Sequence, residues 1–343
     1  MKKLVLIAIL FVLAGTILAV GFNFGWNAYY SAWRVLLGPA RRSLRSVEFE
    51  RTEGRRQRGQ YLAEGILACF RCHSDRDWSE PGGPVPNEKK GAGHVFNKED
   101  IPGLVAPNIT PDLETGAGKW TDDMLARAIR EGIGHDGRVL HPQMWYRAFE
   151  RLSDEDVTSV VVYLRSIPAI RNPLPQTRMS FKQKFRFSTM PKPIMEPRPS
   201  QMFATPKERG EFLEFVGDCA GCHTDWYHEG SAVNGRLFAG GNLIDSPTGE
   251  RIFSPNITPD PSGISYYDEN LFLTVMRTGK VGARPLHGVM PWVFYQNLSD
   301  EDLKAIFAWL RAQEPVKHVV DNTEPPTYCK RCRQKHGGGE RNN

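Results

Sequence analysis

All six cysteines of this 343-residue chain occur in C-x-x-C pairs, and histidine directly follows two of the three pairs. Because each cysteine belongs to such a pair, none is left over for a long-range structural disulfide. The chain is therefore not a disulfide-stapled scaffold, and its cysteines serve local chemistry. The pairs are Cys69 and Cys72, Cys219 and Cys222, and Cys329 and Cys332, and the histidines are His73 and His223.

The pattern C-x-x-C-H is typical of covalent haem attachment. Its two cysteines form thioethers with the porphyrin, and the adjacent histidine is placed to bind the iron. A zinc site would need further cysteine or histidine ligands at matched spacing, which neither segment has. We therefore predict two haem c groups, held by Cys69, Cys72 and His73 and by Cys219, Cys222 and His223.

The two attachment segments belong to an internal repeat. Several landmarks of the first half recur in the second half in the same order, at offsets between 146 and 150 residues. Such regular recurrence predicts two copies of one domain. The landmarks are Cys69 and Cys219, Pro-Asn-Ile-Thr-Pro-Asp at 107–112 and 255–260, Leu-His at 140–141 and 286–287, and Leu-Ser-Asp-Glu-Asp at 152–156 and 298–302.

Each copy is expected to be mostly helical, which makes the fold class all-α. Helix starts with a capping-box pattern are predicted at Thr205, Ser153 and Ser299. Middle helices are expected over 121–131 and 268–277. The closing helices carry apolar residues at three- and four-residue steps, which predicts a core-facing stripe. These residues are Val157, Val160, Val161 and Leu164 in one copy and Leu303, Ile306, Phe307 and Leu310 in the other.

Each copy also offers a second axial iron ligand at a matched position. Met144 lies 71 residues after His73, and Met290 lies 67 residues after His223. Methionine raises the reduction potential and closes the sixth position of the iron, which suits electron transfer. The competing ligands are histidines three residues before each methionine, and histidine would give a lower potential. They are His141 and His287.

Four further residues are candidate partners of the haem propionates. Asn108 and Asn256 lie in the turn-forming Pro-Asn-Ile-Thr-Pro-Asp segments and either contact a propionate or brace the loop. Arg138 and Arg284 match across the copies and either pair with a propionate or face solvent.

The N-terminus sets the expected compartment. Lys2 and Lys3 precede an apolar stretch over 4–20, and aromatic residues follow between 22 and 33. A stretch of this length suits a spanning helix better than a signal-peptide core, and the lysines favour a cytoplasmic N-terminus. We expect an inner-membrane anchor with the bulk of the chain in the periplasm. Cleavage after Gly21 is the alternative, and it would also export the chain.

The expected organisation follows from the repeat and from the composition of the segments around it. Two of these segments are basic, and the second is also rich in proline. A proline-rich basic segment is usually a solvated connector, but it also fits a docking or membrane-surface role. The predicted segments are an anchor or signal at 1–33, a basic stalk at 34–56, a first haem domain at 57–167, a basic linker at 168–204, a second haem domain at 205–315 and a tail at 316–343.

The third cysteine pair departs from the attachment pattern. Arg333 follows Cys332, and the nearest histidine is His336. A third haem is therefore not expected. A disulfide or redox thiol pair, a metal site that uses Cys329, Cys332 and His336, and an inert tail all remain open.

The sequence resembles a known family through four motifs, at Cys69–His73, Ala106–Asp112, Ala128–Gly132 and Leu152–Val157. It is similar to the dihaem and trihaem cytochrome c subunits of membrane-bound bacterial alcohol, aldehyde and gluconate dehydrogenases. The similarity covers 57–170 well and 205–315 more loosely. It implies two tandem class I cytochrome c domains, with iron ligands at His73, Met144, His223 and Met290.

The resemblance implies a protein that takes electrons from a dehydrogenase and passes them to quinone or an oxidase, and that is not an enzyme by itself. One alternative is a dihaem peroxidase, which needs an iron with an open or displaceable distal site. Another is a cytochrome subunit of a respiratory oxidase or reductase complex. The net charge of +5 is mild and does not argue for nucleic acid.

Overall fold

The computed structural model describes residues 33–34, 37–96, 103–226, 231–232, 235–322, 326–328 and 335–338. The predicted anchor therefore lies outside the described residues, except for Trp33. Cys329 and Cys332 also lie outside them. Within the described ranges, no helix has the length and apolar character needed to cross a bilayer.

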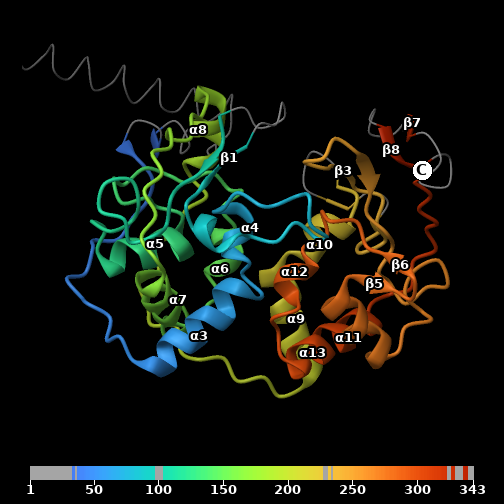
Figure 1. Ribbon diagram of the computed structural model, residues 1–343. Helices are drawn as coiled ribbons and strands as arrows, with labels where there is room; N and C mark the ends of the chain where they lie inside the picture. The colour runs from blue at the N-terminus through green and yellow to red at the C-terminus, as the bar shows by residue number, and fades with distance from the viewer. Residues whose placement is uncertain are drawn as a thin grey trace, which may run out of the picture. The chain divides into compact units, whose positions relative to one another are not determined.

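The chain is mostly helical, and short two-stranded antiparallel sheets accompany the helices (Figure 1). The all-α expectation is thus confirmed for the main elements, while the small hairpins were not predicted. The helices are α3 Glu53–Glu64, α4 Cys69–Cys72, α5 Asp122–Glu131, α6 Tyr146–Phe149, α7 Asp154–Ser166, α8 Phe181–Phe187, α9 Pro206–Gly217, α10 Cys219–His223, α11 Glu269–Thr278, α12 Trp292–Tyr295 and α13 Asp300–Arg311, with a 3-10 turn at Asn87–Lys89. The hairpins pair β1 His94–Val95 with β2 Val105–Ala106, β3 Leu243–Asp245 with β4 Arg251–Phe253, β5 Lys280–Val281 with β6 Arg284–Pro285, and β7 Pro326–Tyr328 with β8 Lys335–Gly338.

The helices begin where the capping signals predicted. Thr205 accepts a hydrogen bond from Glu208 N at 3.2 Å, one residue before α9. Ser153 and Ser299 cap α7 and α13 in the same way, through the amides three residues later. Because these side chains satisfy amides that have no partner within the helix, they fix each start. The apolar stripes of α7 and α13 are buried, as predicted: Val157, Val160, Val161, Leu164, Leu303, Ile306, Phe307 and Leu310.

The repeat is visible in the backbone as well as in the sequence. Ala68 and Asp218, each directly before a first cysteine, both adopt left-handed backbone angles, with φ of 43° and 57°. Gly132 and Gly279 end α5 and α11 in the same conformation. An added Cβ at Gly132 would meet the ring of Tyr146, which explains why the close approach needs glycine.

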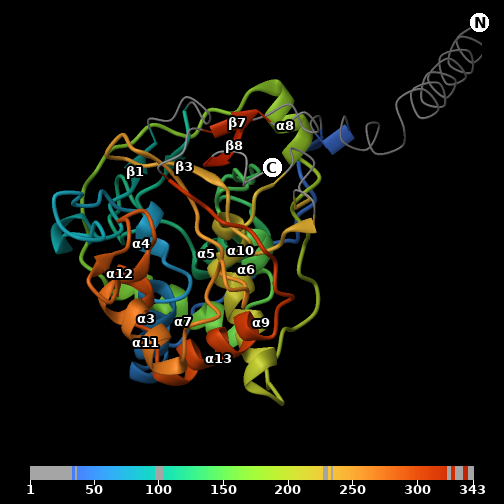
Figure 2. The ribbon, with the colours of Figure 1, turned by 90° about the vertical axis from the view of Figure 1, so that its right-hand side faces the viewer.

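The chain forms two compact units, and neither is a continuous stretch (Figures 1 and 2). Unit 1 contains the residues up to Arg56 together with 92–200. Unit 2 contains 57–91 together with the residues from Gln201 onward. The first attachment segment thus packs within the unit that holds the second. The predicted domains at 57–167 and 205–315 follow the sequence repeat and stay a prediction.

In unit 2, α9 packs closely on α13, because Gly210 brings its backbone against that of Ala305. The helix α3 joins this core through its polar and small residues. The hydroxyl of Tyr61 accepts a hydrogen bond from Ser299 N at 3.0 Å and also bonds to Asp302. Gly65 lies against Leu298. Both contacts join parts of the chain more than 230 residues apart.

In unit 1, the predicted basic stalk is held against α5 by buried ion pairs. Arg42 is only 8% exposed, and its guanidinium contacts both oxygens of Asp123, at 2.6 and 2.8 Å. Its Nε donates to Glu131 at 2.8 Å. The amide of Arg45 donates to Asp123 at 2.8 Å as well. This part of the segment is therefore a fixed strap over α5 rather than a free spacer.

Candidate haem sites

Each attachment segment begins with a sharp change of direction. The left-handed residues Ala68 and Asp218 separate the long helices α3 and α9 from the short turns α4 and α10, which carry the cysteines. This conformation costs a non-glycine residue about 1–2 kcal/mol, so the surrounding structure must hold it. The bend thus sets where Cys69 and Cys219 point in the two copies.

His223 is oriented as a metal ligand would be. The side chain is buried, and its Nδ1 lies 2.9 Å from the carbonyl oxygen of Pro255. A ligating histidine commonly bonds a backbone carbonyl through one ring nitrogen, which leaves the other for the metal. Burial also lowers the pKa of His223, which favours the neutral ring that metal binding requires. His73 is equally buried, at 8% exposure.

The cysteines fit thioether attachment better than thiolate chemistry. Burial raises the pKa of the Cys69 thiol to about 12 and raises that of Cys219 well above its usual value. Reactive redox cysteines and thiolate metal ligands need a lowered pKa instead. The donor set, a cysteine pair followed directly by a buried histidine, therefore fits a covalently attached haem.

The two predicted axial methionines lie in matching turns. Met144 N donates to His141 O at 2.9 Å, and Met290 N donates to His287 O at 3.0 Å. The Nδ1 atoms of both histidines accept from the amide two residues later, at 3.2 Å in each copy. Since Nδ1 is used in this way, each histidine braces the turn that carries the methionine.

This bracing leads to a prediction for His287. Replacing it with alanine removes the acceptor for Val289 N–H, and the loss of one hydrogen bond of about 1 kcal/mol should loosen the Met290 turn. We expect the methionine-to-iron charge-transfer band of one haem to weaken in the oxidised spectrum. His287→Asn should restore the band, because asparagine bonds the amide two residues later in the same way. An unchanged band in His287→Ala would contradict the bracing role.

Asn108 and Asn256 are buried and brace their loops in the same manner. The Oδ1 of Asn108 accepts from the amide and the hydroxyl of Thr110, at 3.0 and 2.7 Å, and its Nδ2 donates to Ile170 O at 2.7 Å. Asn256 bonds Thr258 and Val316 O likewise. Each asparagine thus ties its loop to the chain beyond the closing helix. The predicted propionate contact stays a prediction beside this bracing role.

Arg138 and Arg284 are less enclosed. The Nη1 of Arg138 lies 3.2 Å from Asp136, and Arg284 is exposed on β6. The predicted propionate contacts of both stay predictions.

Unit 2 brings the two attachment segments together. Gly217, two residues before Cys219, lies against Ile66, so that an added Cβ would sit 2.8 Å from its Cδ1. The side chain of Arg71 hydrogen-bonds Cys222. His73, His223 and Met290 all belong to this unit. Met144 belongs to unit 1, and its pairing with the first haem stays a prediction.

Arg76 is a residue that the sequence reasoning missed. Its guanidinium stacks on Trp78 at 4.1 Å and donates to the carbonyls of Gly83 and Gly82, at 2.7 and 2.5 Å. A weaker bond of 3.4 Å reaches Gly288 O, two residues before Met290. Arg76 therefore joins the loop that follows His73 to the Met290 turn. The sequence signal that could have revealed its role is an arginine two residues before a tryptophan, a spacing that allows the two side chains to stack.

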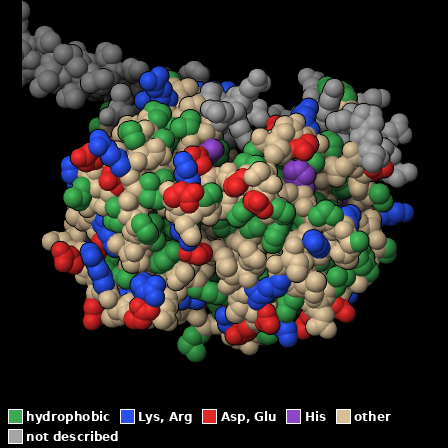
Figure 3. Space-filling view, viewed as in Figure 1, with side chains coloured by type: hydrophobic (Ala, Val, Ile, Leu, Met, Phe, Trp, Pro, Cys, Tyr) green, Lys and Arg blue, Asp and Glu red, His purple; other side chains and the backbone are tan. Residues whose placement is uncertain are grey.

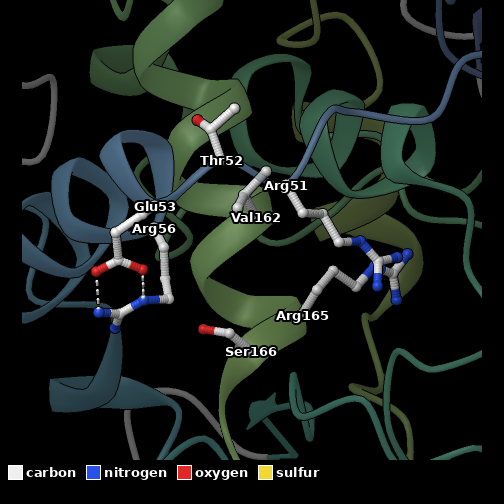
Figure 4. Close-up of a pocket in the computed structure, with 7 residues that line it drawn as sticks. All are labelled: Arg51, Thr52, Glu53, Arg56, Val162, Arg165 and Ser166. Atoms are coloured by element: carbon white, nitrogen blue, oxygen red, sulfur yellow. Dashed lines mark hydrogen bonds and ion pairs between the residues drawn. The ribbon is translucent and has the colours of Figure 1, made fainter.

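A pocket in unit 1 lies apart from these residues (Figure 4). Its cations are partly paired, since Arg56 bonds Glu53 and Arg165 bonds Asp122 at 2.9 Å. None of its lining residues is a predicted haem contact. They are Arg51, Thr52, Glu53, Arg56, Val162, Arg165 and Ser166.

Comparison with known proteins tests the predicted resemblance to dehydrogenase cytochrome c subunits. The fructose dehydrogenase cytochrome subunit of Gluconobacter japonicus is 32% identical over 272 residues, which are 74% of this chain and 52% of that protein. The alcohol dehydrogenase (quinone) cytochrome c subunit of Gluconobacter oxydans is 28% identical over 277 residues, covering 76% of this chain and 55% of that protein. The chain is similar to dehydrogenase cytochrome c subunits. The resemblance that the motifs predicted is confirmed.

A shorter relative matches this chain over a larger share of its own length. A dihaem c-type cytochrome of Cereibacter sphaeroides is 29% identical over 250 residues, which are 71% of this chain and 81% of that protein. The chain spans only about half the length of the fructose and alcohol dehydrogenase subunits. No protein-family profile matches the sequence. These relatives imply covalently bound haem c.

Proposed function

We propose that the chain is a membrane-anchored, periplasmic dihaem cytochrome c that transfers electrons from a dehydrogenase to quinone or to a terminal oxidase. The observation that carries the proposal is the matched pair of sites. In both copies a left-handed residue precedes C-x-x-C-H, and a histidine-braced turn presents a methionine. The similarity to cytochrome subunits of alcohol and fructose dehydrogenases supports a dehydrogenase as the electron donor.

The residues of each site have distinct roles in this function. When bound, haem c supplies one-electron chemistry. The cysteines would hold it covalently, and His73 and His223 would be iron ligands. Met144 and Met290 would be the second ligands, and methionine ligation favours a high potential and electron transfer. The chain would thus position two electron carriers.

Purification from native membranes in mild detergent tests the proposal. We expect the band that stains for haem to travel with a large quinoprotein or flavoprotein dehydrogenase, and addition of that enzyme's substrate to reduce both haems. Co-purification with oxidase or reductase subunits alone would instead assign the chain to a respiratory complex. Rapid turnover of peroxide, with a five-coordinate spectrum on one haem, would replace the proposal by a dihaem peroxidase.

A further inference from the structure

The short helix α8 combines exposed aromatic and basic side chains. Its sequence, Phe-Lys-Gln-Lys-Phe-Arg-Phe, holds three phenylalanines and three cations within Phe181–Phe187. Phe181 is 73% exposed, and its ring lies 6.5 Å from that of Phe185. Amphipathic helices with aromatic and basic residues are typical of the membrane interface.

The cations on and around α8 have no acidic partners. All of them are exposed, and none forms an ion pair with a carboxylate of the described residues. Glu196 is the only acidic residue between 168 and 204. This surface, which we call the α8 patch, therefore carries uncompensated positive charge and fits an anionic partner. Its cations are Arg178, Lys182, Lys184, Arg186 and Lys192.

The α8 patch is held firmly in place. Ser180 and Gln183 form a capping box at the start of α8, with bonds of 3.2 and 2.8 Å. Just before it, Thr177 exchanges two hydrogen bonds with the backbone of Val105. At the other end, Phe187 packs edge-on against His141 at 5.1 Å. The helix is thus presented by the fold of unit 1.

The position of α8 points to a lipid surface. In both views α8 lies at the same end of unit 1 as the dark blue start of the described chain (Figures 1 and 2). Figure 3 shows basic and apolar side chains at that edge. Leu37, at 74% exposure, follows closely in the chain. The predicted membrane segment ends at Trp33, where the described chain begins, at the end of unit 1 that carries the α8 patch.

We propose that the α8 patch lies on the anionic surface of the membrane, with Phe181 among the lipid chains and the cations at the head groups. This inference rests on the proposed export and anchoring of the chain. Each cation near an anionic lipid surface strengthens binding roughly fivefold. The His141 turn that carries Met144 lies directly behind α8. The contact would therefore hold the turn that carries Met144 near the lipid, where quinone dissolves.

Hydrogen exchange on the full-length holoprotein in lipid nanodiscs tests this. Amides of 181–187 should exchange roughly tenfold more slowly in nanodiscs rich in phosphatidylglycerol than in phosphatidylcholine nanodiscs or detergent. The triple variant K182E/K184E/R186E should lose this protection. The matched control K89E/K280E/K317E makes the same change in net charge at exposed lysines of unit 2, and it should keep the protection.

Equal exchange of α8 in all three environments would overturn the proposal. Protection that appears only when a purified dehydrogenase is added would assign the patch to a protein partner instead. Haem content and the visible spectrum, recorded on the same samples, report separately on the proposed function. A normal dihaem spectrum without lipid-dependent protection would therefore reject the membrane contact and leave electron transfer in place.

Discussion

Replacing Arg42 by methionine should destabilise unit 1 by about 3–5 kcal/mol, because it leaves two buried carboxylates without their cation. Asp123 and Glu131 are each only 1% exposed, and Arg42 contacts both of them. Urea unfolding followed by circular dichroism would measure the change, and hydrogen exchange at α5 amides would assign it to unit 1. Arg45→Met is the matched control. Arg45 is 62% exposed at its side chain and 3.6 Å from Asp123, so its loss should cost less than about 1 kcal/mol.

The destabilisation of the same variant should depend on pH. In the wild type, the hydrogen bonds from Arg42 hold the pKa of Asp123 below its usual value despite burial, so this part of the stability is lost as the pH falls. Burial already raises the pKa of Glu131, and loss of Arg42 should raise it further. A raised carboxyl pKa costs stability as the pH rises. The variant should therefore be less destabilised at pH 5 than at pH 8, and an equal loss at both would contradict this account.

Loss of one cysteine pair should remove one haem from the protein. With Cys219→Ala and Cys222→Ala together, the mature chain should lose the mass of one haem and about half of its haem absorbance per polypeptide, because thioethers keep haem c attached. Cys69→Ala with Cys72→Ala should do the same. Intact-mass measurement after expression with the haem-attachment machinery gives both results directly.

The third pair is the control for this experiment. Arg333 follows Cys332 where histidine would be needed, so Cys329→Ala with Cys332→Ala should leave the haem content unchanged. A wild-type mass with three haems, or loss of one haem in this variant, would show that the C-terminal pair also attaches haem.

Much of the local structure could be predicted from the sequence because it depends on short-range signals. Thr205, Ser153 and Ser299 cap their helices as expected, since a cap is decided within four residues. The helix α3 begins at Glu53 directly after Thr52, whose hydroxyl accepts a hydrogen bond from Arg55 N at 3.3 Å, a cap that the sequence analysis did not use. The attachment motif was equally local, since its cysteines and histidine are neighbours in the chain.

Long-range packing could not be predicted in this way. The segment around Arg42 looked like a charged spacer, because composition does not reveal which cations meet Asp123 and Glu131, 81 and 89 residues away. Arg76 was missed for the same reason, since its link to Gly288 spans 212 residues. The bracing role of Asn108 and Asn256 was one of two readings, and only the positions of Ile170 O and Val316 O reveal it.

The discontinuity of the two units has a consequence for the order in which the chain matures. In a chain that emerges from its N-terminus onward, residues 57–91 appear before Ser299 and Asp302, the partners of Tyr61. Unit 1 can close once residue 200 has emerged, but the first cysteine pair must wait for the second half of the chain. During that interval Cys69 and Cys72 lack their packing partners of unit 2, which would leave them open to the enzymes that attach haem. The long-range connection thus gives the growing chain a period in which its first cofactor can be installed before the surrounding core closes.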